Sequence, residues 1–558
     1  MQEIGIENPE VHLEHPEDFA HGDYSTNVAL RYAKELKLKP RELAEKIVTA
    51  LQGLTLNREK GQTFIERIEI AGAGFINFHL SKEFFTKSIG EIFRQAQDYG
   101  KSVSLVHKKV LVEYTDPNPF KEFHIGHLMS NTIGESISRL IGARGAEVKR
   151  ACYQGDVGLH VAKAIWGARS AQIKDLGFKI KEIQEWGKAY ALGAEKYETD
   201  VNAKKEIEEL NKVIYERSDA EINRLHDEGK KVSLAEFERL YKKLSTHFDF
   251  YFFESDMAPR GVEIVREGQK KGVFEESEGA IVFKGEQYGL HTRVFINSQG
   301  LPTYEAKELA LAKYKEEKYP ADTSVVITGN EVNEYFRVLL KAMEFLFPAL
   351  AKKTVHASHG MLRLPSGKMS SRKGDVITAE ALISQVEEMV REKIKEREFS
   401  KEEKEKITEA VAIGALKYSI LRQAVGGDII FDFEKSISFE GDSGPYLQYS
   451  YARAQSVLRK VDKVEPFSDS KVQPPEVGLL ERTLYRFPEV VERAGTLYEP
   501  HHVVTYLIEL SGAFNTWYAQ EKIIGSKEEA YRLSLTQAFA TVMKNGLSLL
   551  GIPVLEQM

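Results

Sequence analysis

Residues 109–127 read KVLVEYTDPNPFKEFHIGH, and this stretch decides the fold. Its first six residues, 109–114, are rich in apolar and β-branched side chains, as in a buried strand. The two prolines of residues 116–119 then forbid regular structure. Apolar residues recur at helical spacing beyond the stretch, at Ile133, Ile137, Leu140 and Ile141. A strand, a turn and a helix are therefore expected in that order.

A second strand follows this predicted helix. Gly142 and Gly145 break the helical pattern, and residues 148–153 are again β-favouring. A strand, a helix and a second strand in succession form a βαβ unit, which is typical of a parallel, doubly wound α/β sheet.

Two other regions flank this α/β region. A small α+β domain is expected over residues 1–100, with a helix at 24–54 and a hairpin formed by 64–70 and 75–80. The α/β domain is expected over 106–385, with strand-like pieces at 280–283 and 323–327. A helical insertion at about 165–280 interrupts it, most clearly over 165–248. Beyond about residue 385 the strands stop, and 386–558 is expected to be an α-helical bundle.

Composition limits the protein's class. The chain has 558 residues, a net charge of −7 and one cysteine, Cys152, which excludes internal disulfides and zinc sites that need two cysteines. We expect no metal-ligating residue set and a reducing compartment. The first residues lack the basic and apolar parts of a signal peptide, and we see no membrane-spanning apolar run, so a cytoplasmic location is expected. A mild acidic excess does not exclude local basic surfaces.

His124-Ile125-Gly126-His127 lies where the predicted strand and turn give way to a helix. A helix start offers free N–H groups and a positive dipole end to phosphate. The two imidazoles add donors, and Gly126 allows a flat ring to approach the backbone. The alternatives are capping or core histidines, or half of a metal site, so this four-residue pattern alone does not decide.

A basic loop is the second candidate feature. Residues 364–374 read LPSGKMSSRKG and contain no acidic residue. Such a loop can clamp a polyphosphate and stabilise the charge that develops on departing pyrophosphate. It is not a Walker A loop, because Leu362 stands at the first glycine position and Met369 follows Lys368. A solvated surface loop is the alternative.

Together the two features resemble the HIGH and KMSKS motifs of class I aminoacyl-tRNA synthetases. Among these the chain is most similar to the arginyl-tRNA synthetase family, and the resemblance covers essentially all of it. Matching segments include HGDYSTN at 21–27, GFINF at 74–78, GDVG at 155–158, PTY at 302–304 and YLQYSYAR at 446–453. The resemblance implies a Rossmann-type catalytic domain, an N-terminal tRNA-recognition domain and a C-terminal anticodon-binding bundle.

The resemblance also implies roles for the nucleotide site. His124, Gly126 and His127 would bind ATP, and the histidines would stabilise the transition state. Lys368, with Met369 and Ser370, would hold ATP and its departing pyrophosphate. The loop has Ser371 where a second lysine is usual, and Lys121 occupies the place of the compensating lysine before HIGH. A solvated lysine is the alternative for Lys121.

For arginine, the resemblance assigns Glu113 and Asn118 to the α-amino group, Tyr304 to the pocket wall and Glu308 to the guanidinium. A carboxylate suits a planar guanidinium, which it accepts through paired, charge-assisted hydrogen bonds. The chain departs from the family pattern at Glu308, usually aspartate, and at Val332, Met129 and Val157. Tyr304 and Glu308 could instead be an exposed pair on one helix face.

Transfer RNA contacts are expected at aromatic and basic residues, namely Tyr446, Tyr449, Trp517, Lys34, Lys37 and Arg41. Core packing is the alternative for the three aromatic residues.

The implied function is arginine–tRNA ligase, a monomer that uses ATP, Mg²⁺, L-arginine and tRNA(Arg). A catalytically impaired homologue that binds tRNA or arginine as a regulator is the main alternative. A small-molecule nucleotidyltransferase is a third, which leaves the two flanking regions unexplained.

Overall fold

The computed structural model describes residues 6, 9–56, 64–170, 182–363, 377–461, 464 and 476–558. The chain divides into two compact units. The larger unit contains residues 100–452, 488–508 and 544–558, and the smaller contains residues 1–99, 453–487 and 509–543. The helices expected to form one C-terminal bundle therefore contribute to both units.

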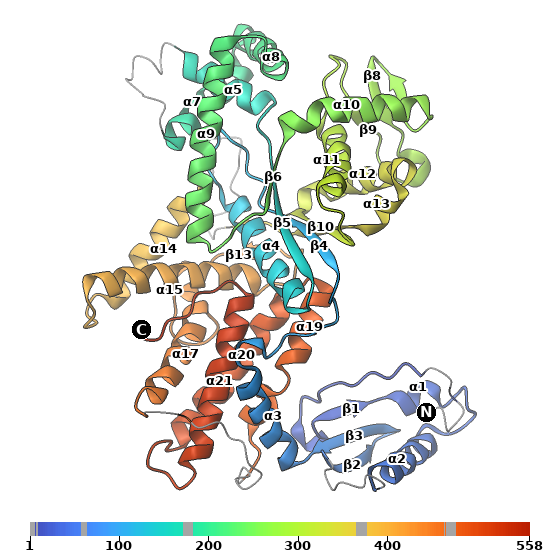
Figure 1. Ribbon diagram of the computed structural model, residues 1–558, viewed down its shortest axis with the longest axis vertical. Coiled ribbons are helices and arrows are strands. Elements are labelled where there is room, and N and C mark those ends of the chain that lie inside the picture. Colours follow the sequence, from blue (N-terminus) through green and yellow to red (C-terminus); the bar gives the residue numbers. More distant parts are fainter. Residues whose placement is uncertain are drawn as a thin grey trace. The chain divides into compact units, whose positions relative to one another are not determined.

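A five-stranded parallel sheet forms the centre of the larger unit (Figure 1). Its order is β11 (Thr354–His359), β10 (Thr323–Gly329), β4 (Lys109–Glu113), β5 (Glu147–Gln154) and β6 (Phe250–Phe253). The chain adds β5 and β6 on one side of β4 and then returns to add β10 and β11 on the other. Ligands of such sheets bind at the carboxyl ends of the strands where the order reverses, here between β4 and β10.

Helix α4 (Ile125–Ala143) joins β4 to β5, which confirms the predicted βαβ unit. Ile133, Ile137, Leu140 and Ile141 are all buried, because this helix packs against the strands and against later helices. The helix ends before Gly145, whose φ of 93° favours glycine and turns the chain into β5.

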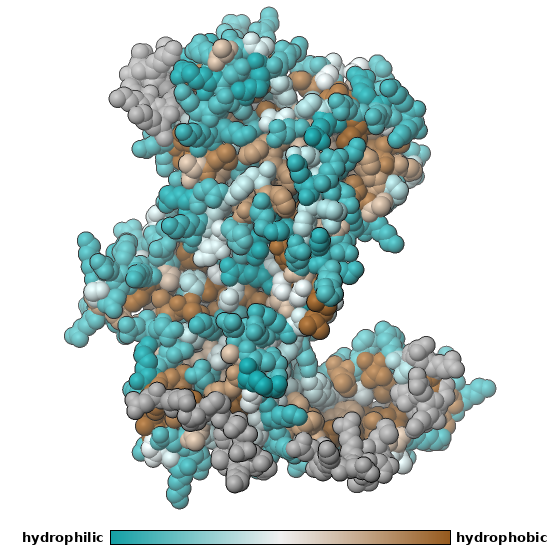
Figure 2. Space-filling view, viewed as in Figure 1, coloured by the Kyte–Doolittle hydropathy of each residue, from teal (hydrophilic) through white to brown (hydrophobic). Residues whose placement is uncertain are grey.

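Four helices form most of the segment between β5 and β6: α5 (Leu159–Arg169), α7 (Ile183–Thr199), α8 (Val201–Glu216) and α9 (Ala220–Lys243). They share a core that includes Trp186 and Phe120. Their outward side chains are mostly hydrophilic in Figure 2, as expected of a charged amphipathic segment. Strand β6 lies inside the range 165–280 expected to be inserted, yet it pairs with β5 in the parallel sheet.

The return from β6 to β10 contains α10 (Glu254–Lys270), a separate antiparallel sheet and α11 (Tyr304–Lys318). That sheet comprises β7 (Glu275–Ser277), β8 (Ala280–Phe283) and β9 (Arg293–Ile296). The strand predicted at 280–283 therefore exists, but it does not continue the parallel sheet. Helices α12 (Asn333–Leu346) and α13 (Pro348–Lys353) then join β10 to β11.

The part of the larger unit beyond residue 377 is almost entirely helical, with α14 (Ala379–Ile394), α15 (Lys401–Leu421), α16 (Phe433–Ser436) and α17 (Gly444–Leu458). The expectation that strands stop near residue 385 was wrong in one place. β13 (Ile429–Ile430) pairs in parallel with β12 (Leu362–Arg363). The pairing is only two residues long, which is too short for a periodic pattern to reveal.

Residues 548–551 lie against the outer face of α4. Ser136 Oγ donates to the carbonyl oxygen of Leu549 at 3.0 Å, and Arg139 Nη1 donates to that of Ser548 at 2.8 Å. Lys417 Nζ, on α15, donates to the carbonyl oxygens of Gly551 at 2.9 Å and Leu244 at 2.6 Å. The cations Arg139 and Lys417 thus satisfy the carbonyl groups of Ser548 and Gly551, at and just beyond the end of helix α21 (Glu529–Leu549), where the helix dipole is negative.

The smaller unit contains an antiparallel sheet in the order β1 (Tyr24–Thr26), β3 (Phe75–Leu80), β2 (Ile65–Ala71). Strands β2 and β3 confirm the predicted hairpin. The helix predicted over 24–54 is instead β1 followed by α1 (Val28–Tyr32) and α2 (Pro40–Leu56). Pro40 explains the interruption, because proline disfavours helical geometry in the residue before it.

The smaller unit also contains α3 (Lys82–Gln95), α18 (Leu479–Leu484), the C-terminal part of α20 (His501–Gln520) and the N-terminal part of α21. Phe514 and Phe539, from these last two helices, stack with ring centroids 3.8 Å apart. Helix α19 (Phe487–Leu497) begins at the limit of this unit. Among the described residues, no helix is both long and apolar enough to cross a membrane.

Candidate active site

A cavity of about 780 Å³ opens at the carboxyl ends of β4 and β10. Its lining includes most of the predicted site residues of the larger unit, namely Glu113, Asn118, His124, Gly126, His127, Tyr304 and Glu308. The cavity thus lies at the reversal of strand order, and residues more than 190 positions apart in the sequence meet in it.

The histidine end of the cavity is formed by the first turn of α4. His124 is the N-cap of the helix, and the backbone N–H of Gly126 donates to its Nδ1 at 3.1 Å. The backbone N–H of His124 donates in turn to His127 Nδ1 at 3.3 Å. The two rings stack with centroids 3.6 Å apart. A side chain at position 126 would approach the His124 ring to 3.0 Å, which explains the glycine.

These bonds determine which nitrogen of each imidazole carries the proton. Both Nδ1 atoms accept hydrogen bonds, so a neutral ring carries its proton on Nε2 and donates from there. Burial, with the nearby charge of Lys121, lowers the pKa of His124 to about 4. Burial, His124 and Lys121 lower the pKa of His127 as well. Both rings are therefore neutral and donate from Nε2.

Lys121 lies outside the set of lining residues but acts on both histidines through its charge. Its Nζ lies 4.4 Å from the ring centroid of Tyr190, on the helical insertion. This cation–π contact holds the ammonium group near the first turn of α4. Lys121 is therefore a partly buried group next to the HIGH histidines.

The predicted residues of the basic loop, Lys368, Met369 and Ser370, lie outside the described residues. The described segments on either side of the loop both reach the site. Arg363 lines the cavity. The N–H of Ile125 donates to the carbonyl oxygen of Ile377 at 3.4 Å, and that of Ala379 donates to the carbonyl oxygen of Phe123 at 2.8 Å.

The acidic end of the cavity is formed by carboxylates from several elements. Glu113, at the end of β4, pairs with Lys315 of α11 at 2.9 Å, and both side chains are buried. Glu254, the first residue of α10, pairs with Lys307 of α11. Glu308 lies one residue from Lys307 and lines the same cavity. Burial and the charge of Glu113 raise the pKa of Glu308 to about 8.

Asn118 and Tyr304 complete the predicted arginine-binding set. Asn118 lies against the backbone of residue 155, where a Cβ atom would approach its Oδ1 to 2.3 Å. Gly155 therefore leaves room for this amide. Tyr304 is 57% exposed and stands at the rim of the cavity, with Lys307 Nζ 4.5 Å from its ring centroid. Tyr304 and Glu308 thus face the cavity together.

Val332 and Met129, two departures from the family pattern, also line the cavity. Met129 is buried, and Val332 packs against the core beneath the sheet. Both positions are apolar walls that add no hydrogen-bonding group to the site.

Several lining residues were not predicted from the sequence: Asp116, Tyr153, Glu254, Arg293, Glu305, Tyr335 and His359. Asp116 is the most informative, because the quoted turn contains it and its Oδ1 accepts from the backbone N–H of Tyr153 at 2.7 Å. Its acidic side chain directly after a buried strand was a usable signal.

The predicted tRNA-binding residues lie elsewhere. Lys34, Lys37 and Arg41 are exposed in the smaller unit, where Trp517 also lies, 6.0 Å between ring centroids from Phe514. Tyr446 and Tyr449 belong to the larger unit and are partly buried. Tyr449 lines a small cavity of about 230 Å³ with Lys393, Arg397 and Met558.

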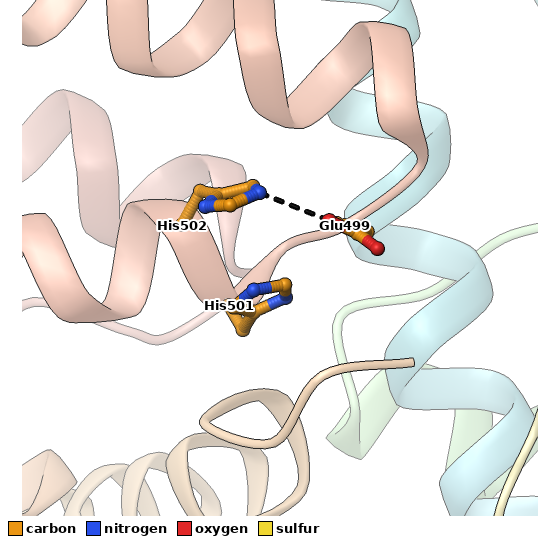
Figure 3. A group of neighbouring side chains, drawn as sticks. All are labelled: Glu499, His501 and His502. Carbon is orange, nitrogen blue, oxygen red and sulfur yellow. Dashed lines mark hydrogen bonds and ion pairs between the residues drawn. The ribbon is translucent and has the colours of Figure 1, made fainter. Parts of the chain in front are cut away.

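Glu499, His501 and His502 form a group whose ligand atoms lie within 4.8 Å of one another (Figure 3). The sequence had suggested no metal-ligating set. His502 Nε2 already bonds to Glu499 at 2.9 Å. The group lies at the positive end of α20, and Arg493 adds a charge that lowers the pKa of His501 after burial and His502. This electrostatic setting opposes a bound cation.

Comparison with known proteins identifies the family of the chain. Residues 88–433 match the family described as tRNA synthetases class I (R), catalytic domain. Residues 447–558 match the DALR anticodon binding domain, and residues 1–80 match the arginyl tRNA synthetase N terminal domain. The chain belongs to the arginyl-tRNA synthetase family.

Full-length relatives agree with this family. The chain is 32% identical to an arginine–tRNA ligase of Clostridium acetobutylicum, over 96% of this chain and 94% of the relative. It is 31% identical to that of Clostridium perfringens, over 100% and 97%. The fold is similar to Thermus thermophilus arginyl-tRNA synthetase, with a TM-score of 0.80, 24% identity and coverage of 100% and 98%. The structure of Plasmodium falciparum arginyl-tRNA synthetase also gives a TM-score of 0.80, at 20% identity, over 100% of this chain and 97% of that one.

Proposed function

We propose that the cavity carries out both steps of an arginine–tRNA ligase, with ATP at its histidine end and arginine at its acidic end. In the first step an arginine carboxylate oxygen attacks the α-phosphorus of ATP, and pyrophosphate leaves as arginyl-adenylate forms. In the second step the terminal adenosine of tRNA(Arg) takes the arginyl group and AMP leaves. The supporting observation is that neutral imidazole donors and unneutralised carboxylates line one cavity.

His124 and His127 would donate from Nε2 to the phosphate oxygens of ATP, with Gly126 giving the nucleotide access to the helix start. Negative charge shifts toward the leaving pyrophosphate during the attack, so these donors bond more strongly in the transition state than in the ground state. Lys121 would add positive charge close to the same oxygens. Lys368, Met369 and Ser370 are proposed to bind the same phosphates, and this proposal rests on the family resemblance alone.

Glu308 would receive the arginine guanidinium through charge-assisted hydrogen bonds. Glu113 and Asn118 would hold the α-amino group, and Tyr304 would cover the rim. The pairing of Glu113 with Lys315 fixes its carboxylate and leaves its second oxygen for the substrate. A pocket built this way rejects neutral side chains, because an unmatched buried carboxylate is costly.

Mg²⁺ is proposed to arrive with ATP. This ion coordinates mainly phosphate oxygens and water and needs only one or two carboxylates. The described cavity residues fit that mode. Their paired carboxylates lie at the acidic end, so phosphate oxygens and water would supply most ligands of the ion at the histidine end. When bound, the ion would neutralise charge on the phosphates.

For tRNA, we propose an N-terminal recognition domain over 1–100, a catalytic domain over 106–385 and an anticodon-binding domain over 386–558. Lys34, Lys37 and Arg41 would contact phosphates, and Tyr446, Tyr449 and Trp517 would contact anticodon bases. A monomer acting in the cytoplasm is the proposed working form.

Aminoacylation of a tRNA(Arg) transcript by purified protein tests the function. We expect arginine- and ATP-dependent charging, and the comparisons give no support to the alternative of an impaired regulatory homologue. Binding of tRNA without any charging would support that alternative. Pyrophosphate exchange that needs no tRNA, with no charging, would instead indicate a small-molecule nucleotidyltransferase.

A further inference from the structure

The acidic end of the cavity contains more carboxylates than its described cations neutralise. Glu113 pairs with Lys315, Glu254 with Lys307, and Glu305 with Arg293 at 3.8 Å. Three further carboxylates on the cavity wall, Asp116, Glu308 and Glu331, form no ion pair with any described residue, and the first two act on each other electrostatically. Asp116 accepts one backbone hydrogen bond, from Tyr153 at 2.7 Å. For Glu308 the described residues provide no hydrogen bond.

The backbone holds Asp116 in the cavity at a conformational cost. Thr115 has φ 81° and Asp116 has φ 47°, in the left-handed region that side chains rarely adopt. Such conformations are unfavourable for residues with a side chain and cluster at functional sites. Ser130 Oγ accepts from the N–H of Thr115 at 2.9 Å, and Asn131 donates to its hydroxyl at 3.1 Å. Both partners come from α4, so the helix that carries the histidines also fixes this turn.

Glu113, Asp116 and Glu308 act on one another electrostatically. Burial and the charge of Glu113 are the main causes that raise the pKa of Asp116, and the same two causes raise that of Glu308 to about 8. Lys315 is the cation that opposes both shifts. Lys315 already pairs with Glu113, so it does not compensate for the burial of Asp116 and Glu308, which disfavours ionisation of both.

Groups on neighbouring elements also shift the pKa values of these carboxylates or are themselves affected by the carboxylates' charge. From α10, α11, β5, α9 and α12 these groups are Glu254, Lys307, Tyr153, Cys152, Tyr241 and Tyr335. Lys307 is already engaged by Glu254. A cationic ligand in the cavity would therefore stabilise the ionised forms of Asp116 and Glu308.

We propose that Asp116 is an additional specificity-determining carboxylate, which together with Glu308 favours a cationic ligand, and that binding of arginine displaces a proton from this pair. The inference rests on the proposed assignment of this pocket to arginine. On binding, the carboxylic O–H bond breaks, the proton passes to solvent, and guanidinium N–H groups donate to the carboxylate oxygens. Citrulline, which has the same shape without the charge, leaves the proton in place. Selection for charge is therefore coupled to proton release.

Calorimetric titration of the full chain with arginine tests this coupling. At pH 7, titrations in phosphate and in Tris separate the heat of binding from the heat of buffer protonation. A group with a pKa near 8 that becomes fully ionised releases about 0.9 proton per arginine. The arginine Kd should then rise by close to tenfold for each unit of pH lowered between 7.5 and 6.5.

Variants distinguish protons released by the two carboxylates from any proton released by the amino group of arginine itself. Glu308→Gln and Asp116→Asn should each lower the number of protons released, whereas Glu263→Gln, an exposed carboxylate of α10, should leave it unchanged. Since arginine is the same in every titration, the difference from the wild-type protein isolates the carboxylates. Unchanged release in Asp116→Asn, with loss in Glu308→Gln, would overturn the assignment of Asp116.

The comparison of the wild-type protein in the two buffers needs no variant, so it still tests the inference if a variant does not fold. Arginine binding with equal heats in the two buffers would overturn the inference alone. Failure of the wild-type protein to bind arginine would overturn the proposed function together with the inference.

Discussion

The two ends of the cavity contain groups of opposite kinds, bases at one end and acids at the other, but burial affects both in the same way. At the histidine end, burial and Lys121 lower the pKa values of two bases. At the acidic end, burial and neighbouring carboxylates raise the pKa values of two acids. The titratable side chains at both ends therefore favour their neutral forms. In the proposed mechanism the imidazoles donate to ATP as neutral rings beside the charged Lys121, whereas the cationic arginine displaces a proton from the carboxylates.

The largest expected effect comes from the histidine end. His127→Ala should slow adenylate formation by about 10³-fold, or roughly 4 kcal/mol, because it removes a donor that acts mainly in the transition state. Single-turnover formation of arginyl-adenylate measures this, alongside the arginine Kd. His247→Ala, an exposed histidine, is the matched control. Equal losses in rate and in arginine affinity would contradict the proposed role.

At the acidic end the effect should fall on binding instead. Glu308→Gln should raise the KM for arginine by about 30- to 100-fold, or roughly 2 to 3 kcal/mol, with a smaller change in kcat. Steady-state aminoacylation at varied arginine concentration measures both constants, with Glu263→Gln as the control. An unchanged KM would remove Glu308 from the arginine pocket and with it the division between the two ends.

The same Glu308→Gln variant should be more stable than the wild-type protein at alkaline pH. The raised pKa of Glu308 means that its favourable contribution is present below about pH 4.5 and is lost as pH rises through about 8. The amide avoids that loss, so the free energy of unfolding at pH 8.5 should rise by about 1 to 3 kcal/mol. Denaturant unfolding at pH 5 and pH 8.5 measures it. A destabilised variant at both pH values would show that the carboxylate is already neutralised.

The smallest effect concerns His124 and has the opposite pH dependence. Its lowered pKa means that its stabilising contribution is present above about pH 6.5 and is lost as pH falls toward 4. His124→Asn keeps an N-cap side chain and should reduce the acid-induced loss of stability by about 1 kcal/mol. Unfolding midpoints between pH 7 and pH 4.5 test this. An identical slope in both proteins would place the acid sensitivity elsewhere.

The two ends also differ in how much the sequence revealed. His124, Gly126 and His127 lie within four positions and cap one helix, so a local pattern was sufficient to predict them. The acidic end draws Glu113, Asp116, Glu254 and Glu308 from several elements, and their proximity depends on the order of strands around β4. Resemblance to the family supplied Glu113 and Glu308. Asp116 was missed although it follows the predicted strand closely, whereas residue spacing could not supply Glu254.

The fold itself was predictable wherever periodicity was strong. The β4–α4–β5 unit and the hairpin of β2 and β3 follow directly from apolar spacing and glycine-rich turns. Strand β6 was missed because its four residues lie after a long charged insertion, and a run that short has no distinctive period. The strand predicted at 280–283 was assigned to the wrong sheet, since a strand pattern does not identify its partner.

The hydrogen bonds between the outer face of α4 and residues 548–549 have a consequence for biosynthesis. Ser136 and Arg139 bond to residues 413 and 409 positions later in the chain. At about 5 to 20 residues per second, a ribosome needs on the order of 20 to 80 s to make that stretch. For all of this time the helix bearing the histidines lacks these partners, so its apolar and cationic face is exposed on the nascent chain and open to chaperones.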